Sequence, residues 1–171
     1  MRKILFDCLS QPLVTEAPPA PDEAALAELA GRVNAAARRR LGRSLAIRAV
    51  DAGSCNGCEL ELHALSNAFY DLERFGIRFV ASPRHGDVLL VTGPVTANMR
   101  EALARSYQAM PEPKWVVAAG DCAVDGGLFA SSYAVVGGAS TVVPVDLHLR
   151  GCPPSPRHLL AGLLALVQKN R

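Results

Sequence analysis

Short hydrophobic runs alternate along this chain with longer segments in which hydrophobic residues recur at helical spacing. The short runs are typical of strands and the longer segments of helices. Predicted strands cover residues 45–50, 77–81, 88–92, 115–119 and 142–145. Predicted helices cover residues 22–41, 59–75, 96–109 and 157–169. Strand and helix therefore alternate along most of the chain.

The predicted strands are almost entirely apolar, so both faces of their sheet are expected to be covered by other elements. Together with the alternation, this predicts an α/β fold with a mostly parallel sheet, in a flavodoxin-like or related doubly wound order. Ligands of such sheets bind outside the carboxyl ends of the strands. We therefore expect a functional site at that edge.

The N-terminal segment differs from the rest of the chain. Residues 1–21 contain several prolines, which lack amide donors and favour an extended tail: Pro12, Pro18, Pro19 and Pro21. The following helix ends in the basic cluster Arg38, Arg39, Arg40 and Arg43. Such cations suit a solvated helix end, and they also suit an anionic lipid surface or an acidic partner. We predict a tail and amphipathic, basic helix over residues 1–44 and an α/β domain over residues 45–171.

The composition excludes several classes of protein. The chain has 171 residues, and its net charge of +2 comes from 18 basic and 16 acidic side chains, a balance that speaks against nucleic acid as a partner. Asp7 interrupts the first apolar run before a signal-peptide core is complete. The apolar run 159–167 is about half the length needed to cross a bilayer. Five cysteines at irregular spacing indicate metal or redox chemistry in a reducing compartment.

Four of the cysteines stand in glycine-rich loops that follow predicted strands. Cys55 and Cys58 are two residues apart after the first strand, Cys122 follows Gly120, and Cys152 follows Gly151. Because the carboxyl ends of parallel strands meet at one edge of a sheet, we expect the four thiols to form one site. Cys8 lies in the tail, and we interpret it as an incidental free thiol.

Four thiolates with no histidine close in sequence can hold zinc or an iron–sulfur cluster. A structural zinc site usually shows two short cysteine pairs, whereas here one pair is joined by two distant single cysteines, an asymmetry that favours a cluster. Cys55 and Cys58 also fit a thioredoxin-like dithiol, but that interpretation leaves Cys122 and Cys152 without a role.

The same motifs, in the same order, resemble a known family over residues 48–167. They are Ser54-Cys55-Asn56-Gly57-Cys58-Glu59, Ser82-Pro83-Arg84-His85, Val91-Thr92-Gly93-Pro94-Val95-Thr96, Gly120-Asp121-Cys122 with Gly126-Gly127, and Val143-Pro144-Val145-Asp146 with Gly151-Cys152-Pro153-Pro154. Together they are similar to the small subunit of membrane-bound group 4 [NiFe] hydrogenases of the formate hydrogenlyase type and to the homologous 20 kDa, B-type subunit of respiratory complex I. The separated Cys-x-x-Cys pair resembles the hydrogenase branch, since complex I subunits usually carry adjacent cysteines there.

This resemblance implies one [4Fe–4S] cluster bound by Cys55, Cys58, Cys122 and Cys152, the proximal relay in an oxidoreductase complex whose active site lies in another subunit. The implied partners are a nickel-bearing large subunit, a ferredoxin-like iron–sulfur subunit and membrane subunits, on the cytoplasmic side of the inner membrane. It also implies that residues 82–87 lie near the large subunit and the arginine-rich helix near the membrane arm. Residues 123–125 depart from the small polar residues common in the family, and the chain lacks a C-terminal extension that some relatives carry.

Two other functions stay open. One is a complex I type subunit whose cluster passes electrons to quinone, and the other is a zinc-stabilised structural module. A large subunit that keeps four nickel-ligating cysteines would separate the hydrogenase from the first of these, and metal analysis would separate it from the second.

A few polar residues outside the cysteine motifs are further candidates. Glu59 and Glu61 open a helix, where carboxylates stabilise the N-terminus, and Glu59 is also a candidate for proton movement at a subunit interface. His85 stands in a loop that can meet a partner, tune the cluster electrostatically or simply face solvent. Three further histidines show no ligand spacing with one another: His63, His148 and His158.

Overall fold

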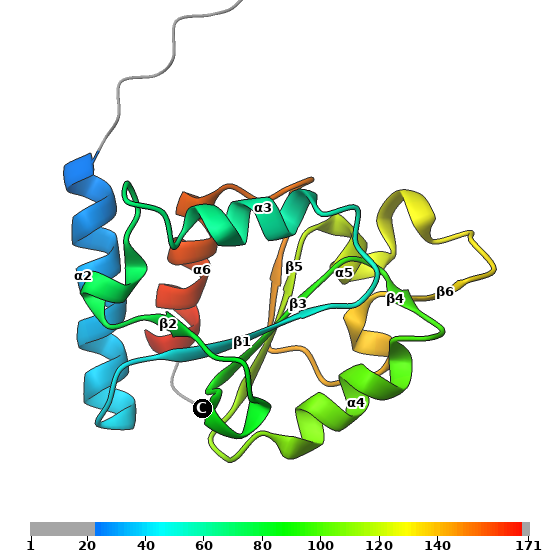
Figure 1. The fold of residues 1–171 in the computed structure, drawn as a ribbon, viewed down its shortest axis with the longest axis horizontal. Coiled ribbons are helices and arrows are strands. Elements are labelled where there is room, and N and C mark those ends of the chain that lie inside the picture. Colours follow the sequence, from blue (N-terminus) through cyan, green and yellow to red (C-terminus); the bar gives the residue numbers. More distant parts are fainter. Residues whose placement is uncertain (1–22, 169–171) are drawn as a thin grey trace, which may run out of the picture.

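Five parallel strands form the centre of the structure, in the spatial order β2-β1-β3-β5-β7 (Figure 1). The computed structural model describes residues 23–168, so the proline-rich tail and Cys8 lie outside the described residues. The strands are β1 (Ala46–Asp51), β2 (Arg78–Phe79), β3 (Val88–Thr92), β5 (Trp115–Ala119) and β7 (Leu147–Leu149). In chain order this arrangement is the 2-1-3-4-5 sheet of flavodoxin-like folds. The predicted fold class is confirmed.

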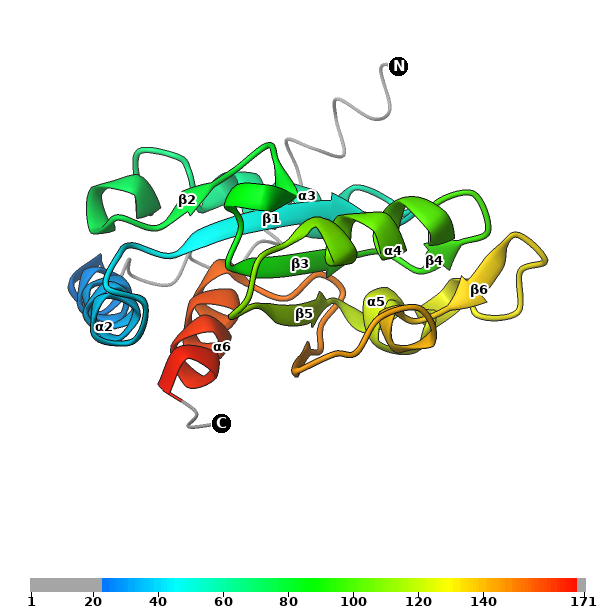
Figure 2. The ribbon, with the colours of Figure 1, turned by 90° about the horizontal axis from the view of Figure 1, so that it is seen from below.

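Helices cover both faces of this sheet. They are α2 (Glu23–Leu41), α3 (Gly57–Ala64), α4 (Arg100–Ala109), α5 (Asp121–Asp125) and α6 (Pro156–Gln168). Side chains of β3 alternate between the faces: Val88 and Leu90 pack with α2, α3 and α6, whereas Leu89 and Val91 pack with α4 and α5. Figures 1 and 2 both show α2 and α6 side by side. The strands are apolar on both faces because both faces are core.

Short elements complete the chain. A two-stranded antiparallel ribbon joins β4 (Val95–Thr96) to β6 (Val135–Gly137). The 3₁₀ turns within residues 23–168 are η1 (Leu72–Phe75), η2 (Pro83–His85), η3 (Gly127–Phe129) and η4 (Ala139–Thr141). Between residues 23 and 168, none of the helices is long and apolar enough to cross a membrane.

The helix after the first cysteine loop is shorter than its hydrophobic spacing predicts. The expected helix ran to Phe75, but α3 ends at Ala64 and the chain turns before η1. The side chain of Asn67 accepts hydrogen bonds from the amides of Phe69 and Tyr70, which competes with helical pairing. Phe69, expected on the buried face, is 41% exposed.

The last strand lies further along the chain than predicted. The expected strand at residues 142–145 is instead irregular, and β7 begins at Leu147. Pro144 cannot donate to a ladder, and the carboxylate of Asp146 accepts the amide of Val116 where a strand carbonyl would otherwise stand. Residues 96–99, expected to begin a helix, lie in or beside the β4–β6 ribbon, and α4 starts at Arg100.

Part of the arginine cluster has a structural role at the end of α2. Arg40 donates to the carbonyl of Val167 at 3.0 Å and lies over the ring of Trp115, 4.9 Å from its centroid. Arg43 pairs with the buried carboxylate of Asp87, which also accepts the amide of Ala46. These contacts fix the amino-terminal edge of the sheet, leaving the exposed Arg38 and Arg39 as the outward part of the cluster.

Candidate metal centre

The four predicted cysteines lie at the carboxyl ends of three strands. Cys55 and Cys58 follow β1, Cys122 follows β5 and Cys152 follows β7. All four side chains line one small cavity of about 90 Å³ at the carboxyl edge of the sheet. The structure therefore brings together the thiols that the sequence places up to 97 residues apart (from residue 55 to residue 152). Strand order explains this convergence, because β5 and β7 are neighbours and β1 lies across β3 from β5.

The loop that carries Cys55 is shaped by two polar side chains. The carboxylate of Asp51 accepts the amides of Gly53 and Ser54 at 2.8 and 2.7 Å, which turns the chain directly after β1. The hydroxyl of Ser54 accepts the amide of Asn56 and donates to the carboxylate of Glu59. Asn56 has a φ of 72°, a left-handed conformation that asparagine tolerates. This turn starts α3 and places Cys58 in its first turn.

The loops that carry Cys122 and Cys152 are tied to each other. The amide of Gly120 donates to Leu149, and the amide of Asp121 donates to Gly151 at 3.0 Å. In return the carboxylate of Asp121 accepts the amide of Gly151. Arg150 also forms an ion pair with Asp125 at 2.9 Å. Two thiols from distant parts of the chain are thus held in one rigid backbone unit.

Two glycines let the backbone pass close to the sulfurs. A Cβ atom on Gly120 would lie 2.6 Å from the Sγ of Cys58, and one on Gly127 would lie 2.8 Å from the Sγ of Cys122. Both glycines also have positive φ angles, 94° and 52°. A side chain at either position would meet both a steric and a conformational penalty. The glycines are therefore required by close approach to the thiols.

The surroundings of the thiols favour their protonated form when no metal is bound. Burial raises the pKa of Cys58 from 9.0 to about 12, and the adjacent carboxylate of Glu59 and the other three thiols add to the rise. Burial and the neighbouring Cys152 and Cys55 also raise the pKa of Cys122. Cys58 and Cys122 are therefore held as thiolates only when positive charge is bound beside them.

The burial of Cys58, with the negative groups around it, predicts unequal reactivity in the metal-free protein. At pH 8, alkylation by iodoacetamide is expected to be at least about tenfold slower at Cys58 than at the exposed Cys55, because only the thiolate reacts. Peptide mass spectrometry over time measures both rates. Denatured protein is the control, in which the two rates should converge. Equal rates in the folded metal-free chain would contradict the protonated state of Cys58.

The four thiols form a donor set that limits the kinds of metal group this site can hold. Thiolates are soft ligands that select zinc, copper(I) or iron–sulfur clusters. Within the described part of the chain, no group of three or more His, Cys, Asp or Glu side chains is close enough to hold one metal ion. In a cluster each thiolate binds a different iron, so its four sulfurs stand further apart than the ligands of a single zinc ion. The structure places all four thiols on one cavity and brings the backbone of two glycines close to the sulfurs.

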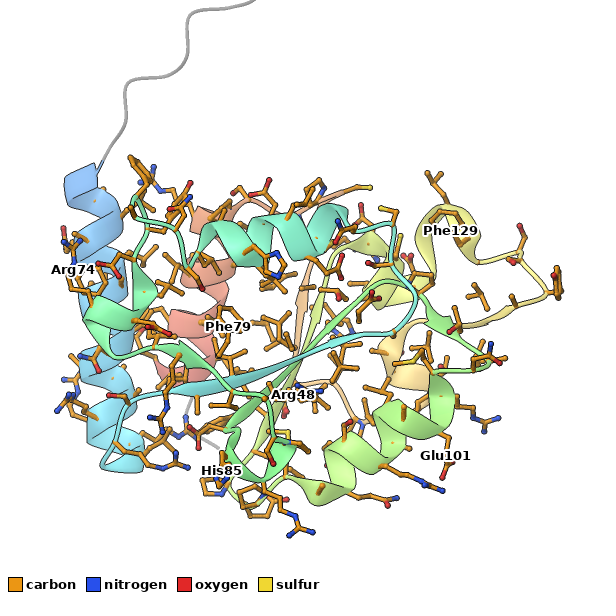
Figure 3. All side chains as sticks on the ribbon, viewed as in Figure 1. Arg48, Arg74, Phe79, His85, Glu101 and Phe129 are labelled. Atoms are coloured by element: carbon orange, nitrogen blue, oxygen red, sulfur yellow. The ribbon has the colours of Figure 1, made fainter. Side chains whose placement is uncertain are left out.

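Other candidate residues divide into those near this centre and those far from it. Glu59 lies in the first turn of α3, as predicted, with one carboxylate oxygen held by Ser54. His85 is exposed in η2, before β3, so the length of β3 separates it from the cysteine loops. Figure 3 shows His85 at the lower edge of the view and Phe129, seven residues after Cys122, at the upper right. His85 therefore does not lie in the shell of groups around the thiols.

Sequence reasoning did not find α5, the short helix that carries Cys122. Five residues between two glycines are too few for a periodic pattern, and propensity alone does not select a helix of that length. Its Asp121 and Asp125 nevertheless organise the site, through Gly151 and Arg150. The available signal was an acidic residue, Asp121, between Gly120 and Cys122.

Comparison with known proteins gives three consistent matches. The family described as NADH ubiquinone oxidoreductase, 20 Kd subunit, matches residues 55–166, a range that contains all four cysteines. Formate hydrogenlyase subunit 7 of Escherichia coli (strain K12) is 46% identical over 124 residues, which is 72% of this chain. The matched region is 49% of that relative, so the chain spans about half of its length.

A solved structure shares the same fold. The membrane-bound sulfane sulfur reductase, an archaeal respiratory membrane complex, contains a chain that superposes with a TM-score of 0.65 and 35% sequence identity. The superposition covers 81% of this chain and 74% of the other. Sequence and structure thus lead to the same group of proteins.

Proposed function

The chain belongs to the family of the 20 kDa subunit of NADH ubiquinone oxidoreductase, and on that premise we propose that it is the electron-transfer subunit of a membrane-associated, hydrogenase-like oxidoreductase complex. In this proposal Cys55, Cys58, Cys122 and Cys152 hold one [4Fe–4S] cluster. The observation that carries it is the convergence of these four thiols on one cavity inside the region matched by the family. A bound cluster would supply one-electron transfer.

The described residues have defined tasks in this proposal. The turn made by Asp51 and Ser54 and the pairing of Asp121 with Gly151 hold the three loops in place before a cluster arrives. Gly120 and Gly127 leave room for the thiols and let backbone amides come near sulfur, where hydrogen bonds tune reduction potential. A cluster can bind Cys58 and Cys122 only when their thiols lose their protons, so cluster assembly depends on pH.

Exposed apolar surface beside Cys122 supports a place within a larger assembly. Residues 126–145 contain no charged side chain. Within them Leu128 and Tyr133 are almost fully exposed, and Phe129 and Val136 are partly exposed. An uncharged surface rich in aromatic and aliphatic side chains is typical of protein interfaces. The partners we propose are a nickel-bearing large subunit, a ferredoxin-like subunit and membrane subunits.

The hydrogenase branch is favoured over the quinone-reducing branch by the match to a formate hydrogenlyase subunit and by the separated Cys55 and Cys58. We place the complex on the cytoplasmic side of the inner membrane, with this chain as a peripheral subunit. Nickel in the co-purified large subunit is the expected result. A large subunit without nickel-ligating cysteines would move the assignment to the quinone-reducing branch.

Iron and acid-labile sulfide analysis tests the proposal directly. The chain should be made anaerobically together with its neighbouring large subunit, because oxygen destroys exposed clusters. About four irons and four sulfides per chain are expected, with an electron paramagnetic resonance signal after reduction. One zinc and no sulfide would overturn the electron-transfer function and indicate a zinc-stabilised module.

A further inference from the structure

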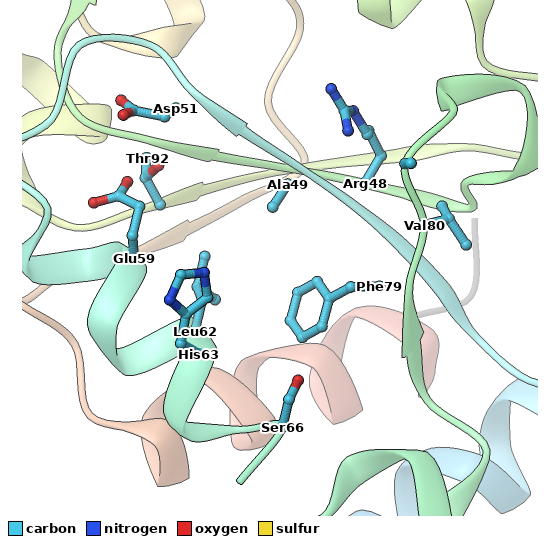
Figure 4. A pocket seen from close by; sticks show the side chains of 11 residues that line it. Arg48, Ala49, Asp51, Glu59, Leu62, His63, Ser66, Phe79, Val80 and Thr92 are labelled. Atoms are coloured by element: carbon cyan, nitrogen blue, oxygen red, sulfur yellow. The ribbon is translucent and has the colours of Figure 1, made fainter.

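A second cavity lies beside the cysteine loops, between α3 and the strands β1 and β2. Its volume is about 420 Å³, and it opens to the surface. Apolar side chains form much of its wall, among them Leu62, Phe79 and Val80, while Glu59 and His63 from α3 and Ser66 just after it contribute polar groups. Figure 4 shows Glu59, His63 and Phe79 around the same space. The cavity is separate from the one that the four thiols share.

One carboxylate oxygen at this cavity is buried without a partner. Oε2 of Glu59 accepts from the hydroxyl of Ser54, but Oε1 is buried and forms no hydrogen bond with any described residue. A buried carboxylate oxygen left unpaired is costly, so such an atom normally has a partner outside the chain that buries it. The missing partner must be a hydrogen-bond donor.

The charges around the cavity specify the kind of donor. Asp51 lines the cavity as a second acid, and its carboxylate is already bound on one oxygen by the amides of its own loop. Arg48 is the lining cation, and its Nε is also buried without a hydrogen-bond partner, but Figure 4 shows its side chain pointing away from the space between His63 and Phe79. The part of the cavity beside Glu59 therefore presents negative charge to whatever enters. A cation satisfies both the charge and the unpaired oxygen.

The apolar wall argues for a side chain rather than a free metal ion. A metal ion would leave Leu62 and Phe79 facing empty space, whereas an arginine or lysine brings an aliphatic stem together with its charge. A guanidinium group also stacks favourably on an aromatic ring and bonds a carboxylate through its planar donors. The cavity has room for such a group and an opening for its entry.

We propose that this cavity is a socket for an arginine or lysine side chain of the large subunit, which pairs with Glu59 and packs on Phe79. The proposal rests on the proposed function, since it requires that partner. It assigns Glu59 a role in holding the subunits together, next to the loop that carries Cys55 and Cys58. The socket would then fix the position of the partner relative to the cysteine loops.

The first test compares Glu59→Gln with Glu61→Gln in the co-expressed complex. Glu61 lies on the same helix but does not line the cavity, so it controls for the loss of one acid near the helix N-terminus. Glu59→Gln is expected to reduce retention of the large subunit in a high-salt wash at least tenfold, whereas Glu61→Gln should retain it. Iron content is measured in both variants. Equal retention by the two variants, with cluster present, overturns the socket.

The second test identifies the occupant. His63, exposed at the cavity, is replaced with the photo-crosslinking residue p-benzoylphenylalanine, and His148, exposed on β7, is replaced in the same way as a control. The His63 position is expected to crosslink to a large-subunit peptide that contains an arginine or lysine, and the His148 position to a different peptide or none. A crosslinked peptide without a basic residue, or an intact complex without any crosslink to the partner, overturns the proposal. A wild-type chain that binds neither cluster nor partner would instead refute the proposed function.

Discussion

Replacing Cys122 with serine is expected to remove the proposed cluster and stop the proposed electron transfer through the complex. Iron should fall from about four atoms per chain to fewer than about one, because a serine oxygen is a poor substitute for a thiolate in a cubane site. Changes to groups that only orient a metal's ligands already cost about 10–100-fold in affinity or activity. Loss of a ligand should therefore lower hydrogen turnover by at least about 100-fold. Iron analysis and turnover assays on the purified complex measure both effects.

The chain offers a matched control for this substitution. Cys8 is predicted to be incidental, so Cys8→Ser should keep full iron content and full turnover. Cys152→Ser should behave like Cys122→Ser, because both thiols stand in loops joined by Asp121 and Gly151. Retention of four irons in the Cys122 variant would show that this thiol is not a ligand. Loss of iron in the Cys8 variant would show that the ligand set is wrong.

The sequence was sufficient to predict that the four thiols converge, because two independent patterns agreed. Apolar runs without polar alternation indicated a parallel sheet, and that topology alone placed the residues after β1, β5 and β7 at one edge. Cysteines and glycines in those loops then predicted a shared site. The agreement did not depend on exact element ends, so the displacement of the last strand to Leu147 left the position of Cys152 correct.

Some element boundaries and the cavity beside Glu59 could not be predicted from the sequence. They depend on interactions between distant residues or on local contacts between side chains and the backbone. Helical spacing continued past Ala64, but Asn67 and the following turn ended α3 through side-chain to backbone bonds. The pairing of Asp146 with Val116 replaced a predicted strand. The cavity beside Glu59 depends on residues from α3, β1 and the segment after β2, and no short motif carries that information. Burial of Oε1 of Glu59 could be seen only once the chain was folded.

Adding a single methyl group at Gly120 is expected to damage the site nearly as much as removing a ligand. The new Cβ would lie 2.6 Å from the Sγ of Cys58, and a φ of 94° is a conformation that alanine rarely adopts. Such backbone strain costs on the order of 1–3 kcal/mol, and displacing Cys58 should reduce bound iron by more than half. For a chain of this length, each kcal/mol lowers the melting temperature by about 2–4 °C.

Gly31→Ala is the control, since Gly31 lies inside α2 and a Cβ there meets nothing within 4 Å. That change should raise stability by about 0.5–1 kcal/mol, because alanine loses less backbone entropy in a helix, and leave the iron content unchanged. Thermal unfolding and iron analysis of both variants distinguish an effect specific to the cysteine site from the effect of replacing a glycine elsewhere in the chain. If Gly120→Ala keeps both its cluster and its melting temperature, then the thiol of Cys58 does not lie where the cysteine loops place it, and the assignment of Cys58 as a ligand fails with it.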